Sequence, residues 1–182
     1  MKIVFVSDIH GCYARLEPVL NFFDKVQADL LCIGGDIINY GPRNGLPKDG
    51  LDPQAIVQAL NARKSHIVAI RGNCDSEVDQ MLLHFPLLSD YSVVTDGQRR
   101  FFLTHGHLFN LRERPLWLDA DVVVSGHTHL WELERDASGA VMLNTGSITF
   151  PKGGNVPTFA YYDGAQISVL TLDGDVLKSL EL

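Results

Sequence analysis

The chain opens with Met1-Lys-Ile-Val-Phe-Val-Ser-Asp-Ile-His10, in which an apolar run leads directly into a carboxylate and an imidazole. Branched and aromatic side chains between Ile3 and Ser7 are typical of a buried strand, because they pack well on a pleated surface. The run is shorter than the core of a secretion signal and lacks the small-residue cleavage pattern. We therefore expect the first strand of a buried sheet here, followed at once by polar residues.

Two further apolar runs resemble this first strand, and helical patterns separate them. Leu30 to Ile33 and His66 to Ile70 are the second and third predicted strands. Apolar residues recur at helical spacing from Val19 to Val26, and Pro18 predicts that this helix begins near it or kinks there. Asp52-Pro53 predicts the N-cap and first position of another helix. This alternation is typical of βαβ units around a largely parallel sheet.

The second half of the chain is richer in strands. Asp96-Gly97 is a hairpin signal between predicted strands at 91–95 and 100–103, and 121–125 is a further buried strand. Short runs separated by turns then predict a mostly antiparallel tail with strands at 131–135, 140–143, 158–162, 166–172 and 176–182. No repeat or linker-like tract interrupts the sequence. It predicts one α/β domain over residues 1–182, with two packed mixed β-sheets flanked by helices.

Composition and charge exclude several classes of protein. Of 182 residues, 46% are hydrophobic and 20% are charged, which favours a packed core over disorder. The 15 Lys and Arg and 22 Asp and Glu give a formal charge of −7, which argues against bulk binding to nucleic acid or anionic membranes. No apolar run approaches the roughly 18 residues of a membrane span, and three scattered cysteines form no disulfide framework, so we expect a cytoplasmic protein. Core or interface positions are expected for Cys32, 81–85, 101–102 and Trp117.

Five predicted strands run directly into polar residues that can bind metals, and glycine lies beside or close to each set. These residues are Asp8 and His10, Asp36, Asn73, His105 and His107, and His127 and His129. Because the carboxyl ends of strands in α/β sheets form the ligand crevice, we expect the five segments to converge. Each piece alone is common, since a lone Asn is usually a turn residue and a lone His is usually a hydrogen-bonded core group. The joint pattern predicts a metal centre.

Carboxylates and imidazoles together suit a pair of divalent ions. Two such ions about 3.5–4 Å apart repel each other, and a bridging carboxylate with a bridging hydroxide would offset that repulsion. Asp36 is the natural bridge. Mixed oxygen and nitrogen ligation suits Mn²⁺, Fe²⁺, Zn²⁺ or Co²⁺ better than Ca²⁺.

The ordered blocks resemble those of a known family, the calcineurin-like metallophosphoesterases. Its D-x-H, G-D, G-N, H and G-H-x-H blocks are matched by Asp8-Ile-His10, Gly35-Asp36, Gly72-Asn73, His105 and Gly126-His-Thr-His129. The chain looks closer still to the bacterial YfcE-type phosphodiesterases through Tyr40-Gly-Pro-Arg-Asn44, Arg71-Gly-Asn-Cys-Asp-Ser-Glu77 and Pro151-Lys-Gly-Gly-Asn155. The resemblance implies a four-layer α/β/β/α sandwich. It also implies hydrolysis of phosphodiester bonds by in-line attack of a metal-bridging hydroxide.

The same resemblance implies a role for each matching residue. One ion would take Asp8, His10, Asp36 and His129, and the other would take Asp36, Asn73, His105 and His127. The expected cofactor is therefore two divalent ions, Mn²⁺ first, with Zn²⁺, Fe²⁺, Co²⁺ and Mg²⁺ as alternatives. Asn73 and His107 are the candidate catalytic residues, and Asn73 would also contact the phosphate through its amide. For His107 we favour a role in orienting a ligand over a direct phosphate contact.

Cys74 departs from the pattern of many family members, in which His follows Gly-Asn and protonates the leaving group. A thiol is a poor substitute acid, and we interpret Cys74 as packing beside the site. If no strong general acid is present, substrates with good leaving groups, such as aryl esters, should be favoured over alkyl esters.

A Gly- and Pro-rich loop at 39–51 follows the second predicted strand and supplies Arg43 and Asn44 as candidate substrate contacts. A solvated Arg and a turn Asn explain these two residues equally well. Lys152-Gly-Gly-Asn155 lacks the spacing of a P-loop, and we interpret it as a loop near the site.

Two other functions compete with the phosphodiesterase. One is a non-catalytic metal-binding scaffold or interaction subunit, like the retromer subunit that resembles these enzymes but has lost part of the ligand set. Competent side chains occupy all seven ligand positions here, which favours the enzyme. The other is hydrolysis of carboxylic esters or amides, which the family resemblance ranks lower. We expect a small phosphodiester as the partner, no membrane, and a homo-oligomer as an option that the strand-rich tail allows.

Overall fold

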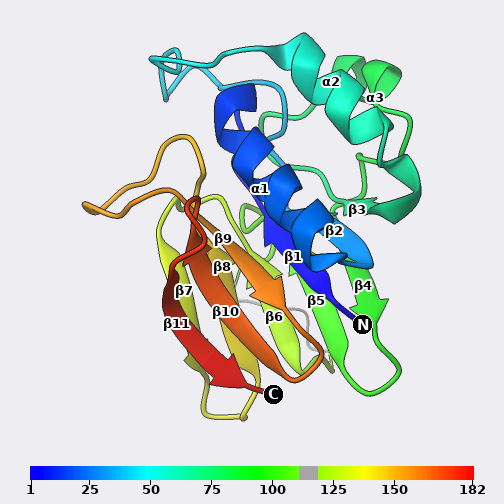
Figure 1. Cartoon of the computed structure of the whole chain (residues 1–182), viewed down its shortest axis with the longest axis vertical. Coiled ribbons are helices and arrows are strands. Elements are labelled where there is room, and N and C mark those ends of the chain that lie inside the picture. The colour runs from blue at the N-terminus through cyan, green and yellow to red at the C-terminus, as the bar shows by residue number, and fades with distance from the viewer. Residues whose placement is uncertain (111–118) are drawn as a thin grey trace.

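The computed structural model describes residues 1–110 and 119–182, which form two face-to-face β-sheets with helices on the outer face of the larger sheet (Figure 1). The larger sheet has the order β11-β10-β9-β1-β2-β3. Its strands are β1 (Ile3–Val6), β2 (Leu30–Ile33), β3 (Ile67–Ala69), β9 (Thr158–Tyr162), β10 (Gln166–Thr171) and β11 (Val176–Glu181). The pairings β1–β2 and β2–β3 are parallel, whereas β9, β10 and β11 pair antiparallel, as the sequence predicts.

The smaller sheet has the order β4-β5-β6-β8-β7. Its strands are β4 (Tyr91–Thr95), β5 (Arg100–Thr104), β6 (Val122–Ser125), β7 (Trp131–Arg135) and β8 (Val141–Thr145). The hairpin predicted at Asp96-Gly97 joins β4 to β5, while β5, β6 and β8 run parallel to one another. The predicted fold class of two packed mixed sheets is confirmed.

The helices in the described ranges are α1 (Tyr13–Val26), α2 (Pro53–Asn61), α3 (Glu77–Leu82) and the short 3-10 turn at Lys64–His66. α1 begins at Tyr13, well before Pro18, so of the two effects expected of that proline the start near it is wrong and the kink stays a prediction. Its buried face extends upstream to Leu16, and this packing outweighs the hydrogen bond that a proline cannot donate. α2 begins as predicted, because the Asp52 carboxylate accepts the Ala55 N–H at 2.9 Å. The sequence did not predict α3.

Alternation along β1 shows how the layers are built. Val4 and Val6 face α1 and α2, whereas Ile3 and Phe5 face the smaller sheet, where Phe5 packs against Phe101. Cys32 lies in this second core, as expected. The outer face of the smaller sheet carries a third cluster that includes Phe102, Val123 and Met142. Trp117, expected in the core or at an interface, belongs to 111–118 and lies outside the described residues.

The apolar run at 81–85 divides between core and surface. Leu83 and Phe85 are buried, but the Met81 side chain is 81% exposed and is not part of the core. Within the ranges 1–110 and 119–182, no helix is long and apolar enough to cross a membrane.

Candidate metal centre

The seven predicted ligands follow five strands drawn from both sheets. Asp8 and His10 follow β1, Asp36 follows β2, and Asn73 follows β3, all in the larger sheet. His105 follows β5, and His127 and His129 follow β6, in the smaller sheet. The structure brings the carboxyl ends of these strands together, as contacts between the two sets of loops show.

The backbone at these positions is unusual. Asp8, His10, Asp36, His127 and His129 have φ between 49° and 67°. Only one other non-glycine residue among the described ones, Gln27, has a positive φ. A left-handed conformation costs a non-glycine residue on the order of 1 kcal/mol, and such strain gathers at functional sites. The loops therefore hold these five residues in a strained backbone conformation, which fixes the direction of their side chains.

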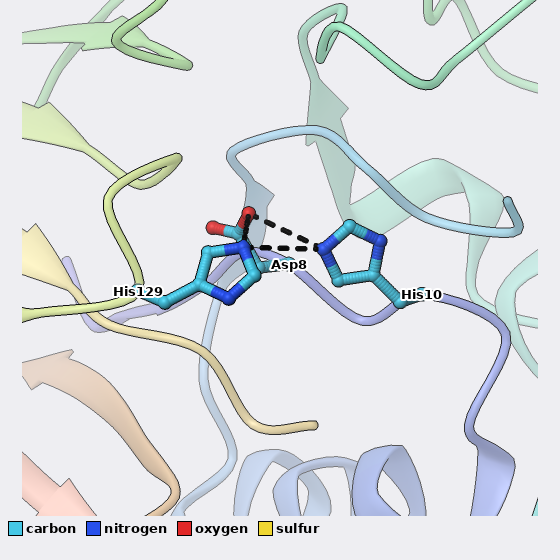
Figure 2. Close-up of side chains that lie close together, drawn as sticks. All are labelled: Asp8, His10 and His129. Atoms are coloured by element: carbon cyan, nitrogen blue, oxygen red, sulfur yellow. Dashed lines mark hydrogen bonds and ion pairs between the residues drawn. The ribbon is translucent and has the colours of Figure 1, made fainter. Parts of the chain in front are cut away.

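Asp8, His10 and His129 form one close cluster, with their polar atoms pointing at one another (Figure 2). Asp8 Oδ1 lies 3.1 Å from His129 Nε2 and 3.6 Å from His10 Nε2. The two Nε2 atoms are 3.4 Å apart. All three residues are buried, so this concentration of donor atoms is shielded from bulk water.

Backbone carbonyls hold the imidazoles in one orientation. His10 Nδ1 donates to Asn39 O at 2.9 Å, His105 Nδ1 to Gly34 O at 2.7 Å and His129 Nδ1 to Phe150 O at 2.7 Å. A neutral ring that donates from Nδ1 carries its lone pair on Nε2. Each ring thus presents Nε2 to the cluster, which is how metal-ligating histidines are usually held.

Asp36 lies between two groups of donors. Its Oδ2 is 3.8 Å from His10 Nε2 and 3.5 Å from His105 Nε2. On the far side, His105 Nε2 is 3.1 Å from Asn73 Oδ1. The His127 ring lies beside that of His105, with centroids 5.0 Å apart. Asp36 therefore has the central position expected of a bridge.

The residues present fit a cation. Asp8 Oδ2 accepts hydrogen bonds from Ser7 Oγ and His127 N, but Oδ1 is buried and has no hydrogen-bond donor within the described residues. An unsatisfied buried carboxylate oxygen is costly, and here it faces imidazole lone pairs. Three donor sets each lie within 4.8 Å: Asp8, His10 and His129; Asp8, Asp36 and His105; and His10, Asp36 and Cys74.

The pKa shifts of Asp8 and His10 favour the charged forms of both residues. Burial opposes ionisation of Asp8, yet the adjacent imidazoles of His10 and His129 outweigh burial and hold the pKa of this carboxyl well below its usual range. Burial would lower the pKa of His10, but contact with Asp8 outweighs burial and raises it. For His107 and His127, burial and the nearby His105 lower the pKa, so both rings favour the neutral form.

Asp75 is a site residue that the sequence analysis missed. Its Oδ2 accepts the N–H groups of Asp36 and Gly72, both at 2.7 Å, and its Oδ1 accepts that of Ile37 at 2.9 Å. The carboxylate is 3% exposed and ties the loop after β2 to the loop after β3. Its place two residues after Asn73 was visible in the sequence, but nothing local revealed its partners.

Three hydroxyl and amide side chains from the β8 end were also missed. Ser147 Oγ donates to Asp8 O at 2.9 Å, and Thr149 Oγ1 donates to Ile9 O at 2.7 Å. Asn144 Nδ2 donates to Gly126 O at 2.8 Å and also contacts Ser125 and Thr128. These bonds fix the loops that carry His10, His127 and His129.

Two glycines permit the close approach of the loops. A Cβ at Gly72 would lie 2.1 Å from Asp36 Oδ1. A Cβ at Gly126 would lie 2.0 Å from Ser7 Oγ and 2.5 Å from Asp8 Oδ2. Both distances are far below van der Waals contact, so only glycine leaves room for the carboxylates at these two positions.

A cavity of about 690 Å³ opens above this cluster. Among its lining residues are Asp36, Asn73, His127 and His129 from the centre, Arg43 and Asn44 from the loop after β2, and Lys152. Asn44 also donates from its amide to Tyr40 O at 2.9 Å, so it stabilises its own loop as well as lining the cavity. Lys152 joins the site through its backbone N–H, which bonds to His129 O at 3.0 Å.

His107 and Cys74 flank the centre. The His107 ring lies 5.3 Å from that of His105, and its buried Nδ1 has no partner within the part of the chain that is described. The Cys74 N–H donates to Asp36 Oδ1 at 2.8 Å, and its sulfur accepts from Asn73 Nδ2 at 3.2 Å. Burial and the nearby Asp36 raise the pKa of the Cys74 thiol to about 12.

The calcineurin-like phosphoesterase superfamily domain matches residues 1–166 of this sequence. The chain belongs to that superfamily. It is 45% identical over 174 residues to phosphodiesterase YfcE of Escherichia coli K12, a match that covers 95% of this chain and 93% of the relative.

Two further comparisons place the chain within the superfamily. A solved structure of E. coli YfcE, described as a phosphoesterase, superposes with a TM-score of 0.94 at 43% identity and covers 100% of this chain and 99% of that one. The probable metallophosphoesterase YsnB of Bacillus subtilis is 27% identical over 184 residues, covering 96% of this chain and 86% of the relative. The superfamily expected from the ordered blocks is confirmed.

Proposed function

We propose that this chain is a dinuclear metal-dependent phosphodiesterase. The observation that carries the proposal is the buried, unpartnered Asp8 Oδ1 facing two imidazole nitrogens whose lone pairs point inward. Two divalent ions would supply a hydroxide nucleophile at neutral pH and neutralise charge on the phosphate. Similarity to phosphodiesterase YfcE directs the proposal to phosphodiesters.

Distances support the assignment of the first ion to Asp8, His10, Asp36 and His129. Ligand atoms about 2.0–2.2 Å from one ion lie roughly 3.0–3.5 Å from each other. The separations of 3.1, 3.4 and 3.6 Å among Asp8, His10 and His129 are close to that range. Asp36, Asn73, His105 and His127 would hold the second ion, supported by the 3.1 Å approach of Asn73 to His105.

The remaining roles belong to residues around the cavity. Arg43 is exposed, lines the cavity and would bind a phosphate oxygen by a charge-assisted hydrogen bond. Asn73 would turn its amide oxygen to an ion and its N–H to the phosphate. Asn44 would help to place Arg43 by holding the loop, and His107 would orient His105 or His127.

A substrate and metal panel tests the proposal. The protein is stripped with a chelator, reloaded separately with Mn²⁺, Zn²⁺, Fe²⁺, Mg²⁺ or Co²⁺, and assayed on phosphomonoesters and phosphodiesters. We expect diester hydrolysis, with Mn²⁺ the most effective ion. Asp36→Asn should lower both metal content and rate. Two bound ions without hydrolysis of any member would support a scaffold instead.

The leaving group should matter strongly in this panel. The Cys74 thiol, with a pKa of about 12, is a weak proton donor at neutral pH. We therefore predict that aryl diesters such as bis(nitrophenyl) phosphate are hydrolysed much faster than alkyl diesters. The comparison of kcat under chemistry-limited conditions checks this, and equal rates would contradict it.

A small phosphodiester in the cytoplasm is the expected substrate, without bulk binding to nucleic acid or membranes. Assembly into a homo-oligomer stays a prediction, for which sedimentation is the direct measurement.

A further inference from the structure

Cys74 places a sulfur beside the proposed metal centre, and neither of the two proposed ion sites uses it. It follows Asn73, is half-buried and lines the cavity together with Asp36. Its sulfur, a ring nitrogen of His10 and a carboxylate oxygen of Asp36 all lie within 4.8 Å of one another. The sulfur, nitrogen and oxygen atoms are therefore grouped closely enough to be candidate ligands of one ion.

The other two members of this set are held in place. His10 is fully buried and Asp36 is 2% exposed. His10 donates Nδ1–H to Asn39 O, which turns its Nε2 toward the cluster, and the Cys74 N–H donates to Asp36 Oδ1 at 2.8 Å. Next to this set, Asp8 Oδ1 is buried without a hydrogen-bond donor among the described residues and lies 3.6 Å from His10 Nε2.

We propose that His10, Asp36 and Cys74 form an alternative site for a thiophilic divalent ion, of which Cd²⁺ is the probe. Thiolate selects soft ions, whereas the oxygen and nitrogen sets suit Mn²⁺. On binding, a sulfur–metal bond forms, the S–H bond breaks and the proton leaves to solvent. Cys74 is the single cysteine of the described residues that falls in such a donor set.

Occupation of this site excludes the arrangement proposed for catalysis. His10 and Asp36 belong to both donor sets, so a soft ion removes ligands from the hard ions. Asn73 Nδ2 donates to the Cys74 sulfur at 3.2 Å while Asn73 Oδ1 faces His105. A metal on that sulfur would compete with this hydrogen bond and free the Asn73 amide to rotate. The consequence, inhibition, rests on the proposed function, but the existence of the site does not.

Ultraviolet absorption tests the site without any assay of activity. Metal-stripped protein is titrated with CdCl₂, and the sulfur-to-cadmium charge-transfer band is recorded for wild type, Cys74→Ser and Cys32→Ser. Cys32 is buried in the core between the sheets and is the matched control. We expect the band in wild type and C32S and its loss in C74S. A full band in C74S, or none in wild type, would overturn the proposal.

A competition assay then measures the consequence. Loss of a residue that only orients a metal ligand typically weakens metal affinity by about 10–100-fold. Loss of the sulfur ligand itself in C74S should therefore weaken Cd²⁺ inhibition of the Mn²⁺-loaded protein by at least about tenfold. Equal inhibition of wild type and C74S would refute the competition. If wild type shows the band but hydrolyses no substrate, the cadmium site is supported and the proposed function is refuted. The failure of one proposal is thus distinguishable from the failure of the other.

Discussion

Asp75 controls the position of two metal-binding loops through backbone contacts. Its three hydrogen bonds, to the N–H groups of Asp36, Ile37 and Gly72, join the segments that present Asp36 and Asn73. A carboxylate can accept all three, because it has two oxygens and no hydrogen to place against a donor. Its contribution to the centre is therefore geometric.

Asp75→Asn should weaken Mn²⁺ binding by about 10–100-fold, as expected for a partner that orients ligands. The introduced NH₂ faces backbone donors and leaves a buried group unsatisfied, which should also cost about 1–3 kcal/mol of stability. Calorimetric titration with Mn²⁺ and urea unfolding measure the two effects. Asp79→Asn is the matched control, because Asp79 is another buried carboxylate that caps α3 through Ser76. Equal Mn²⁺ affinity in both variants would argue against positioning.

The ligands could be predicted from the sequence, but their supports could not. Each ligand follows an apolar run within a few residues, so its place at a strand end is a local property. The partners are distant: Thr149 bonds to Ile9 across 140 positions, and Ser147 bonds to Asp8 across 139. The positive φ at five ligand positions results from this packing and has no signature in the residue types.

At the scale of elements, local chemistry decides how well a boundary can be predicted. α2 begins where Asp52-Pro53 predicts, because a side-chain cap and a fixed φ act within one turn. α1 begins at Tyr13, upstream of Pro18, because the packing of Leu16 in the core outweighs the preference of proline for the first turn of a helix. α3 was missed because its six residues expose Val78 and Met81, and a short helix without an apolar face gives no periodic signal.

Asp52→Ala should lower the free energy of unfolding by about 1 kcal/mol, the usual value of an N-cap. The lost interaction is the 2.9 Å hydrogen bond from Ala55 N to Asp52 Oδ1. Mn²⁺ affinity should be unchanged, because no predicted ligand contacts this carboxylate. Gln54→Ala, at an exposed position of the same helix, should change stability by less than about 0.5 kcal/mol. If urea unfolding gave the same result for both variants, the cap would not be stabilising the helix.

At the scale of the whole molecule, the centre joins the two sheets at the carboxyl ends of their strands. The larger sheet supplies Asp8, His10, Asp36 and Asn73, and the smaller sheet supplies His105, His127 and His129. Apolar packing holds the sheets together elsewhere, through residues such as Phe5, Phe101 and Tyr162. At these strand ends, buried carboxylates and imidazoles take the place of apolar packing between the sheets. The formal charge of −7 is thus an average over a surface that surrounds a centre built to hold cations.

Metal binding should therefore stabilise the whole chain. An ion that binds only the folded state adds about 2.7 kcal/mol when its free concentration is 100 times Kd. For a chain of this size 1 kcal/mol shifts Tm by about 2–4 °C, so one Mn²⁺ site predicts a rise of roughly 5–11 °C over the chelated protein. Calorimetric scans with excess Mn²⁺ or chelator measure the rise. Asp36→Asn, which removes the shared ligand, should lose most of it. An unchanged Tm in the wild type would mean that the two sheets are held together without the metals.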